Sequence, residues 1–169
     1  MKRSNPFFIG VKWGAALVLC ISLFSCDSSL IFDDNFAFPA HAWHKDSAVT
    51  FNFSTDSIYA EQATIAINLR HTTDYSYRNL WLFMDLYIPN EPVQRDTLNL
   101  SLMDELGHDS PNVKSEGLIG GTIKESKHYY RYGVQNPPSG TYKIKLQHAM
   151  RQDVLNEVVS IGARIEKIK

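Results

Sequence analysis

Residues 64–89 read TIAINLRHTTDYSYRNLWLFMDLYIP, and this stretch decides the fold. Apolar and polar residues alternate over 65–70, which is the period-two pattern of a strand with one buried face. The polar run 71–74 favours a turn through its hydroxyl and carboxylate side chains. A longer strand follows over 80–88, and Pro89 ends it because proline cannot donate a ladder hydrogen bond. The stretch therefore predicts two successive strands joined by a turn.

The longer strand is apolar on both faces. One face carries Leu80, Leu82, Met84, Leu86 and Ile88. The other face carries Trp81, Phe83 and Tyr87 together with Asp85. Two apolar faces indicate a strand near the middle of a sheet whose outer face is also partly covered, so we expect the aromatic set to lie under a loop. The alternative is an open aromatic platform for a sugar ring or a partner protein, because aromatic side chains give large contact areas at little entropic cost.

Most of the remaining chain also reads as strand. Alternating or aromatic segments occur at residues 49–53, 97–102, 128–134, 142–148 and 158–168, and turn signals rich in Asn, Pro and Gly separate them. Helical spacing is confined to residues 149–156, which read as one short helix or a turn. Short strands without intervening helices predict a single all-β domain, an antiparallel sandwich of the jelly-roll or immunoglobulin-like kind.

The N-terminus reads as a lipoprotein signal peptide over residues 1–25. Three basic residues lie in its first twelve positions, and the apolar run 13–24 is shorter than the roughly 20 residues that span a bilayer. It ends in Leu-Phe-Ser-Cys, where a small residue precedes Cys26 as in a bacterial lipobox, so we predict that Cys26 carries the lipid. The alternatives are an ordinary secretory signal or an uncleaved helical anchor that ends in a cysteine by chance.

The cysteine count agrees with lipidation. Cys20 lies in the segment to be removed and Cys26 would be acylated, so the mature protein would hold no disulfide. We expect residues 26–40 to form the lipidated cysteine and a polar tether, and residues 41–169 to form the sandwich. A chain with two or three acyl groups stays firmly in a membrane. The expected location is the cell envelope, anchored by lipid in the outer membrane, on its periplasmic or surface face.

Charge argues against nucleic acid as a partner. The whole chain has a formal net charge of −1, and removing the three basic residues of the signal segment leaves −4. No basic cluster of the kind that a phosphate backbone requires is present in the sequence.

Candidate chemistry is sparse. His41 and His44 have a spacing that a metal ion could use, but a packed Trp43 between two polar edge residues is the preferred interpretation. The acidic segment 104–109 (DELGHD) suggests a calcium loop or, as we prefer, a solvated turn. The sequence contains no Gly-x-Ser-x-Gly elbow and no glycine-rich phosphate loop before a helix. We therefore predict no metal, no cofactor and no catalytic residues.

The candidate binding surface consists of Arg70, Tyr75, Tyr77 and Trp81. The first three gather with Arg78 at the end of one predicted strand and in the following loop. Their hydroxyl and guanidinium groups can pin that loop by hydrogen bonds, which we prefer, or present a polar recognition surface.

The chain resembles a known family in several short pieces. In the central stretch these are NLRHT at 68–72, Tyr75, Tyr77, Asn79, Leu80, Leu82 and Phe83. Further along they are Asp96, Thr97, Asp104, Gly107, Gly140, Tyr142, AMR at 149–151 and GARIE at 162–166. Together they resemble the gliding-motility lipoproteins called GldH, found in Bacteroidetes. This chain has DSPNVK at 109–114 where the family tends to carry a Trp-Leu-Gly-like run, so no role of that loop is carried over.

The resemblance implies a non-enzymatic envelope lipoprotein that works by contact with components of the motility machinery and of the secretion system coupled to it. The alternative is a carbohydrate-binding jelly-roll lipoprotein, which requires an open Trp81 face. A hydrolase is a third hypothesis, for which the sequence offers no assembled acid–base or nucleophilic group. Fold alone does not choose among the three.

The lipobox generates the first testable prediction. The wild-type protein should incorporate labelled palmitate in its own cells, and Cys26→Ala should abolish the label because the acylated sulfur is gone. Cys20→Ala, which changes a residue of the cleaved segment, is the matched control and should label normally. Incorporation that survives Cys26→Ala would refute the assignment.

Overall fold

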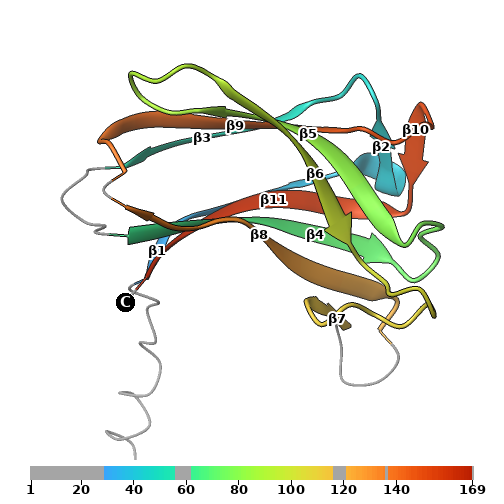
Figure 1. Cartoon of the computed structure of the whole chain (residues 1–169). Helices are drawn as coiled ribbons and strands as arrows, with labels where there is room; N and C mark the ends of the chain where they lie inside the picture. Colours follow the sequence, from blue (N-terminus) through green and yellow to red (C-terminus); the bar gives the residue numbers. More distant parts are fainter. Residues whose placement is uncertain (1–28, 56–61, 116–120, 136, 169) are drawn as a thin grey trace, which may run out of the picture.

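The computed structural model describes residues 29–55, 62–115, 121–135 and 137–168, and they form two antiparallel sheets packed face to face (Figure 1). The first sheet has the order β1 (Leu30–Ala37), β11 (Val158–Lys167), β4 (Gln62–Thr72), β8 (Ile123–Gln135) and β7 (Val113–Ser115). The second sheet has the order β3 (Val49–Thr55), β9 (Gly140–His148), β5 (Asn79–Tyr87) and β6 (Gln94–Ser101). The predicted all-β antiparallel sandwich is confirmed.

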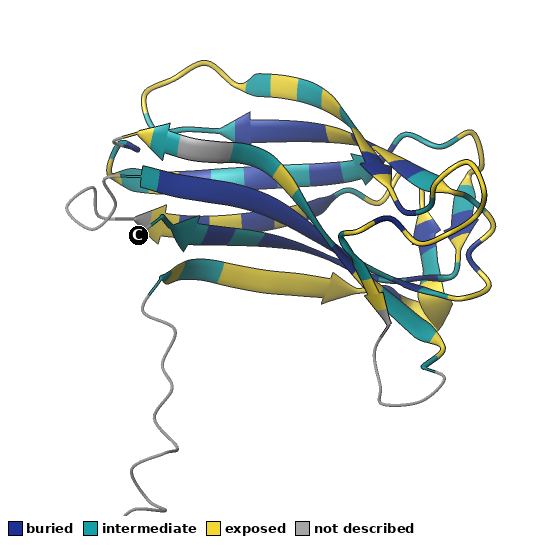
Figure 2. Cartoon of the chain, turned by 60° about the horizontal axis from the view of Figure 1, so that its bottom comes forward, coloured by how far each residue is buried: buried dark blue, intermediate teal, exposed yellow. Residues whose placement is uncertain are grey.

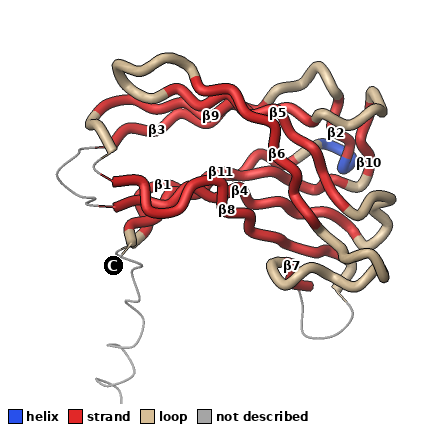
Figure 3. Tube along the Cα trace, in the orientation of Figure 1, coloured by secondary structure: helices blue, strands red, loops and turns tan. Residues whose placement is uncertain are grey.

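Residues 64–89 contribute one inner strand to each of the two large sheets. Strand β4 lies between β11 and β8 in the first sheet, and β5 lies between β9 and β6 in the second. The connection over 73–78 therefore crosses from one layer of the sandwich to the other. In the tube drawing, the strands run the length of the molecule and the loops collect at its two ends (Figure 3).

The core follows from the alternation along these two strands. Ile67 and Leu69 of β4 and Leu82 and Met84 of β5 are fully buried, and all point between the sheets. Strand β9 adds further buried residues from the second sheet. Burying an aliphatic side chain stabilises the fold by roughly 1.5–3 kcal/mol, so these facing rows hold the layers together. Figure 2 shows long buried stretches on the inner strands, whereas β1 at the edge is mostly exposed.

A small third sheet closes one end of the sandwich. It pairs β2 (Ala42–His44) with β10 (Val154–Asn156), next to the short 3-10 turn η2 (Pro39–His41). Trp43 is fully buried there, stacks on Phe38 at 4.7 Å between ring centroids, and donates its indole N–H to the Ser47 carbonyl at 2.7 Å. The preferred interpretation of Trp43 as a packing residue between two exposed histidines is confirmed.

Two boundary predictions are wrong. The sequence predicts a polar tether over residues 26–40, but residues 30–37 form β1, which pairs with β11 through backbone hydrogen bonds that composition does not reveal. The domain therefore begins before residue 41. The sequence predicts a short helix or a turn over residues 149–156, but the last three of these residues form β10 because β2 offers them a partner edge.

The signal peptide and Cys26 lie outside the described residues, so the cleavage and lipidation sites stay predictions. Among the residues that the structure does describe, no helix has the length and apolar character needed to cross a membrane.

The two faces of β5 generate a stability prediction. Leu82→Ala removes a fully buried side chain and should lower the free energy of unfolding by about 2–5 kcal/mol, the usual range for a leucine cavity. Phe83→Ala is the matched control on the opposite face, where the ring is 47% exposed, and should cost under about 1 kcal/mol. Urea unfolding followed by circular dichroism measures both. Equal losses for the two variants would contradict the assignment of faces.

Candidate functional site: an exposed aromatic surface

The structure separates the four predicted surface residues. Arg70 lies on the outer face of the first sheet, whereas Trp81 lies on the outer face of the second. Tyr75 is only 4% exposed, and Tyr77 is half-buried beside it in the loop between β4 and β5. The prediction of one surface built from all four is wrong, because the loop carries the chain from one layer to the other.

Tyr75 pins this loop. Its hydroxyl donates to the carbonyl of Asn79 at 3.1 Å, and its ring meets the edge of Tyr77 at 5.6 Å between centroids. Burial, with a smaller contribution from Tyr77, raises the pKa of the Tyr75 hydroxyl far above its ordinary value, so it remains protonated and keeps donating. This is the pinning role preferred from the sequence, and it removes Tyr75 from the set of exposed contacts.

Trp81 and Phe83 are open to solvent, which corrects the expectation that a loop covers them. Their side chains are 40% and 47% exposed. The register explains this exposure, because Trp81 faces Asn99 of β6 and Phe83 faces Thr97, and neither partner is large enough to cover an aromatic ring. The outer face of an inner strand was read as covered because it is apolar. The apolar character of a strand face does not show whether a loop of the same chain covers that face or whether it is open to bind a partner.

The chain that follows β9 forms the rim of this face. Ala149 donates its backbone N–H to the Trp81 carbonyl at 2.7 Å, and the backbone N–H of Trp81 donates to the sulfur of Met150 at 3.4 Å. The resulting hollow of about 310 Å³ is lined by Tyr77, Asn79, Trp81, Ala149, Met150, Arg151 and Gln152.

We call Tyr77, Trp81, Phe83, Met150 and Arg151 the Trp81 surface. Aromatic residues, methionine and arginine are the types enriched at the centre of protein interfaces. An apolar ring beside a guanidinium group can fill a pocket and accept a carboxylate from the same partner. The surface is therefore suited to binding a protein.

An ion pair orders the other end of the same face. Asp85 is 8% exposed and accepts two hydrogen bonds from the Arg95 guanidinium, at 2.6 and 3.0 Å. The hydrogen bond from Arg95 holds the pKa of the Asp85 carboxyl below its ordinary value, so the pair is charged at neutral pH. The Lys143 ammonium group lies 3.7 Å from the centre of the Tyr87 ring. These charged contacts mark where the apolar part of the face ends.

Comparison with known proteins shows the family of this chain. The profile of the family described as GldH lipoprotein matches residues 30–165. The chain belongs to the GldH lipoprotein family. It is 36% identical to a gliding motility lipoprotein GldH homolog of Christiangramia forsetii over 159 residues, covering 89% of this chain and 92% of the relative. It is 32% identical to the gliding motility lipoprotein GldH of Flavobacterium johnsoniae over 162 residues, covering 91% and 95%. No solved structure matches the chain.

Pieces of sequence that resemble GldH meet in space. The segment 149–151 packs against Trp81, next to Tyr77 and Asn79 of the central stretch. The segment 162–166 pairs with 64–68 on neighbouring strands of the first sheet. As a member of a gliding-motility lipoprotein family, the protein is expected in the cell envelope and attached to a membrane.

The acidic segment 104–109 is a closed turn. One Asp104 carboxylate oxygen accepts the backbone N–H groups of Leu106 and His108 at 2.9 and 2.8 Å, and Gly107 adopts a positive φ of 84°. Asp109 pairs with Lys124 at 2.6 Å. In the part of the chain that the structure describes, no group of three or more His, Cys, Asp or Glu side chains is placed to hold a metal ion.

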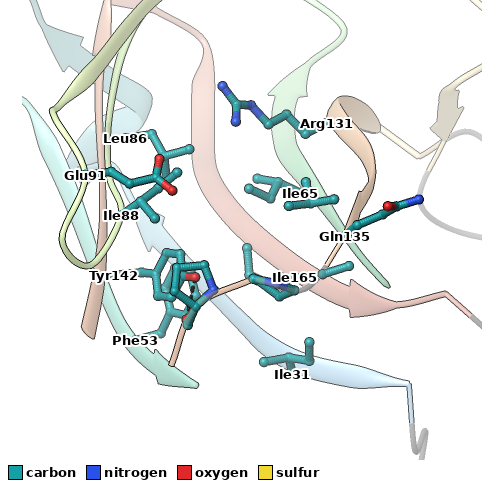
Figure 4. A pocket seen from close by; sticks show the side chains of 14 residues that line it. Ile31, Phe53, Ile65, Leu86, Ile88, Glu91, Arg131, Gln135, Tyr142 and Ile165 are labelled. Carbon is teal, nitrogen blue, oxygen red and sulfur yellow. Dashed lines mark hydrogen bonds between the residues drawn. The ribbon is translucent and has the colours of Figure 1, made fainter. Parts of the chain in front are cut away.

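A mostly apolar cavity of about 170 Å³ lies at the other end of the sandwich, between the sheets (Figure 4). Ile65, Leu86 and Ile165 contribute apolar walls, and Arg131 and Glu91 contribute the charged groups at its margin. Arg131 donates to the side chain of Gln94 and so bridges β8 to β6. The described lining of the cavity is mostly apolar.

Sequence reasoning missed several residues of the Trp81 surface. Met150 and Arg151 were noted only as part of the resemblance, because their approach to Trp81 depends on β9 lying beside β5. Phe83 was assigned to the correct face and then expected to be covered. The alternation along β5 was the available signal for Phe83, whereas no local pattern indicates a contact between residues almost 70 positions apart.

Three histidines are held neutral inside the domain. Burial lowers the pKa of His71 and of His148, both of which are inaccessible to solvent. Burial also lowers the pKa of His128 to about 4. The His128 ring lies 2.9 Å from the Ser126 hydroxyl and 3.0 Å from the Asn112 amide. Half-buried and placed next to these two groups, His128 has a structural role.

These histidines predict an acid-sensitive fold. A base whose pKa is lower in the folded protein binds its proton in the unfolded chain first, so the free energy of unfolding should fall as the pH drops from about 6.5 toward about 4. Between these two pH values His128 contributes a slope of at most about 1.4 kcal/mol per pH unit.

The measurement is urea unfolding of wild type and variants between pH 7.5 and 4. His128→Gln should make the decline shallower, and His44→Gln, which changes an exposed histidine, should leave it unchanged. A decline of the same slope in His128→Gln would show that His128 does not carry it.

Proposed function

We propose that this GldH-family protein is a non-enzymatic accessory component of the gliding-motility machinery and of the protein secretion system coupled to it. It is anchored in the outer membrane through lipid on Cys26 and acts by binding an envelope protein through the Trp81 surface. The observation that carries the proposal is the exposed Trp81–Phe83 pair on an ordered strand, edged by Met150 and Arg151. Membership of the family supplies the motility context.

Exposure of the Trp81 and Phe83 rings to water is unfavourable in free energy. A tryptophan and a phenylalanine two positions apart on an inner strand present apolar area to water, and association with a partner recovers that free energy. The strand fixes both rings before binding, so little conformational entropy is lost when the complex forms. A rigid aromatic centre with an arginine at its edge has the composition of a binding hot spot.

The disposition of the titratable groups supports a role by contact. His71 and His148 are enclosed in the core, and Asp85 and Asp104 are engaged by Arg95 and by backbone N–H groups. General acid–base catalysis requires groups that can reach a substrate and change protonation there. These side chains instead stabilise strands and turns.

The proposal predicts which substitutions abolish function. Trp81→Ala and Arg151→Ala, each introduced singly into a strain that lacks the chromosomal copy, should fail to restore surface spreading or export of secreted proteins. Each removes a contact expected to contribute about 2 kcal/mol or more to binding. Val93→Ala changes a side chain that is 48% exposed in the connection between β5 and β6, so it is the matched control and should restore both activities.

Membrane attachment and abundance of every variant are checked by fractionation and immunoblot. A photo-cross-linking amino acid placed at position 81 should capture a component of the motility or secretion machinery, and the same group at position 93 should not. Full restoration by Trp81→Ala and Arg151→Ala, or an oligosaccharide as the molecule bound at Trp81, would overturn the proposal.

A further inference from the structure

The outer face of the first sheet carries charged side chains, in contrast to the aromatic Trp81 surface. Lys127 of β8 pairs with Glu166 of β11 at 2.6 Å, Arg164 pairs with Glu166 at 2.6 Å, and Arg164 also pairs with Asp33 of β1. Burial raises the pKa of Glu166, but hydrogen bonds from Lys127 and Arg164 outweigh it and hold that pKa below the ordinary value. These ion pairs cover the central strand β4, whose outward Ala66 is only 1% exposed.

Next to these ion pairs, a row of Asn, Gly and Lys residues crosses four strands of the first sheet. The strand register places Asn35 of β1 opposite Gly162 of β11, Gly162 opposite Asn68 of β4, and Asn68 opposite Lys127 of β8. Gly162 has no side chain, so the side chain of Asn35 lies over the middle of the row. A Cβ atom there would lie 2.0 Å from the side-chain oxygen of Asn35 and 2.7 Å from the backbone oxygen of Asp34.

A hollow at this row has a volume of about 350 Å³, within the size range of ligand pockets, about 300–1,000 Å³. It is lined by Asp33, Asn35, Asn68, Asn112, Lys114, Glu125, Lys127 and Arg164. The lining therefore mixes ammonium, guanidinium, carboxylate and amide groups.

Asn68 is the unexpected member of this lining. It is 8% exposed, and the side-chain amides of Asn35 and Asn68 make no hydrogen bond to another group of the described chain. The amide atoms of Asn68 are not among the buried polar atoms of the described chain that lack a partner, because the side chain lines the hollow. The two amides face the same hollow and supply both donors and acceptors to whatever enters it.

We propose that this hollow binds a hydroxyl-rich glycan chain. A sugar hydroxyl both donates and accepts, which matches a lining of paired amides between carboxylates and cations better than it matches a purely anionic or purely apolar ligand. Tyr129 lies on the same face, is 58% exposed, and has the Lys127 ammonium group 5.1 Å from its ring centre. Its ring offers an apolar plane at the margin against which the C–H face of a sugar can stack.

The site differs from the Trp81 surface in place and in chemistry. The Asn35–Gly162–Asn68–Lys127 row belongs to the first sheet, and Trp81 belongs to the second. One protein can therefore hold a glycan on one face and a protein partner on the other, and neither proposal depends on the other.

The test uses full-length protein in micelles of a detergent without a sugar headgroup. Hexasaccharides of glucose, mannose, galactose and N-acetylglucosamine are titrated to millimolar concentration while amide chemical shifts are followed by two-dimensional nuclear magnetic resonance. At least one should move resonances of β4, β8 and β11 near Asn68. Inorganic phosphate, the anionic probe, should not reproduce the pattern.

Variants then assign the effect to the two amides. Asn68→Ala and Asn35→Ala should each weaken binding at least tenfold, whereas Asn52→Ala, which changes an exposed asparagine of β3, should leave it unchanged. The melting temperature of Asn68→Ala should stay close to that of the wild type, because the amide faces the hollow. A lack of response to every saccharide, shifts centred on Trp81, a response to phosphate alone, or normal binding by both variants would overturn the proposal.

Discussion

The packing of β4 against the layer that contains β5 is the contact on which the rest of the structure depends. Each strand occupies an inner position of its own sheet, so each recruits strands from distant parts of the chain on both sides. The facing rows that include Leu69 and Met84 exclude water completely. The connection between the strands crosses the sandwich directly, so a segment of few residues links the two layers.

The same alternation that builds the core also creates two contrasting outer faces. On the first sheet, long charged side chains from β8 and β11 fold over β4 and neutralise one another, which leaves a polar hollow at Asn68. On the second sheet, the neighbours of Trp81 and Phe83 are short, so the aromatic rings remain in contact with water. Function is proposed for both faces, but for opposite reasons: one retains unpartnered polar groups and the other retains uncovered apolar area.

Several residues that carry the resemblance to GldH make identifiable contacts in the structure. Asn68 and Gly162, from two separate pieces, are opposite one another in the strand register. Met150 contacts the backbone of Trp81 through its sulfur. Tyr142 donates to the Pro138 carbonyl at 2.7 Å, and Gly140, with a φ of 137°, lies so close to Pro89 that a Cβ atom would approach its ring to 2.9 Å. Some of these residues therefore maintain the fold, while others shape its surfaces.

The sequence by itself determined the all-β class, the inward and outward faces of β4 and β5, and the packing role of Trp43, because each depends on local alternation or on the residue type alone. It also predicted a lipid anchor from the lipobox. Only the tertiary structure decided that residues 30–37 form β1, that Trp81 is exposed, and that Arg70 and Trp81 lie on different sheets. Those properties depend on which strands become neighbours across long separations. Strand pairing uses backbone hydrogen bonds common to every residue, so composition carries little information about it.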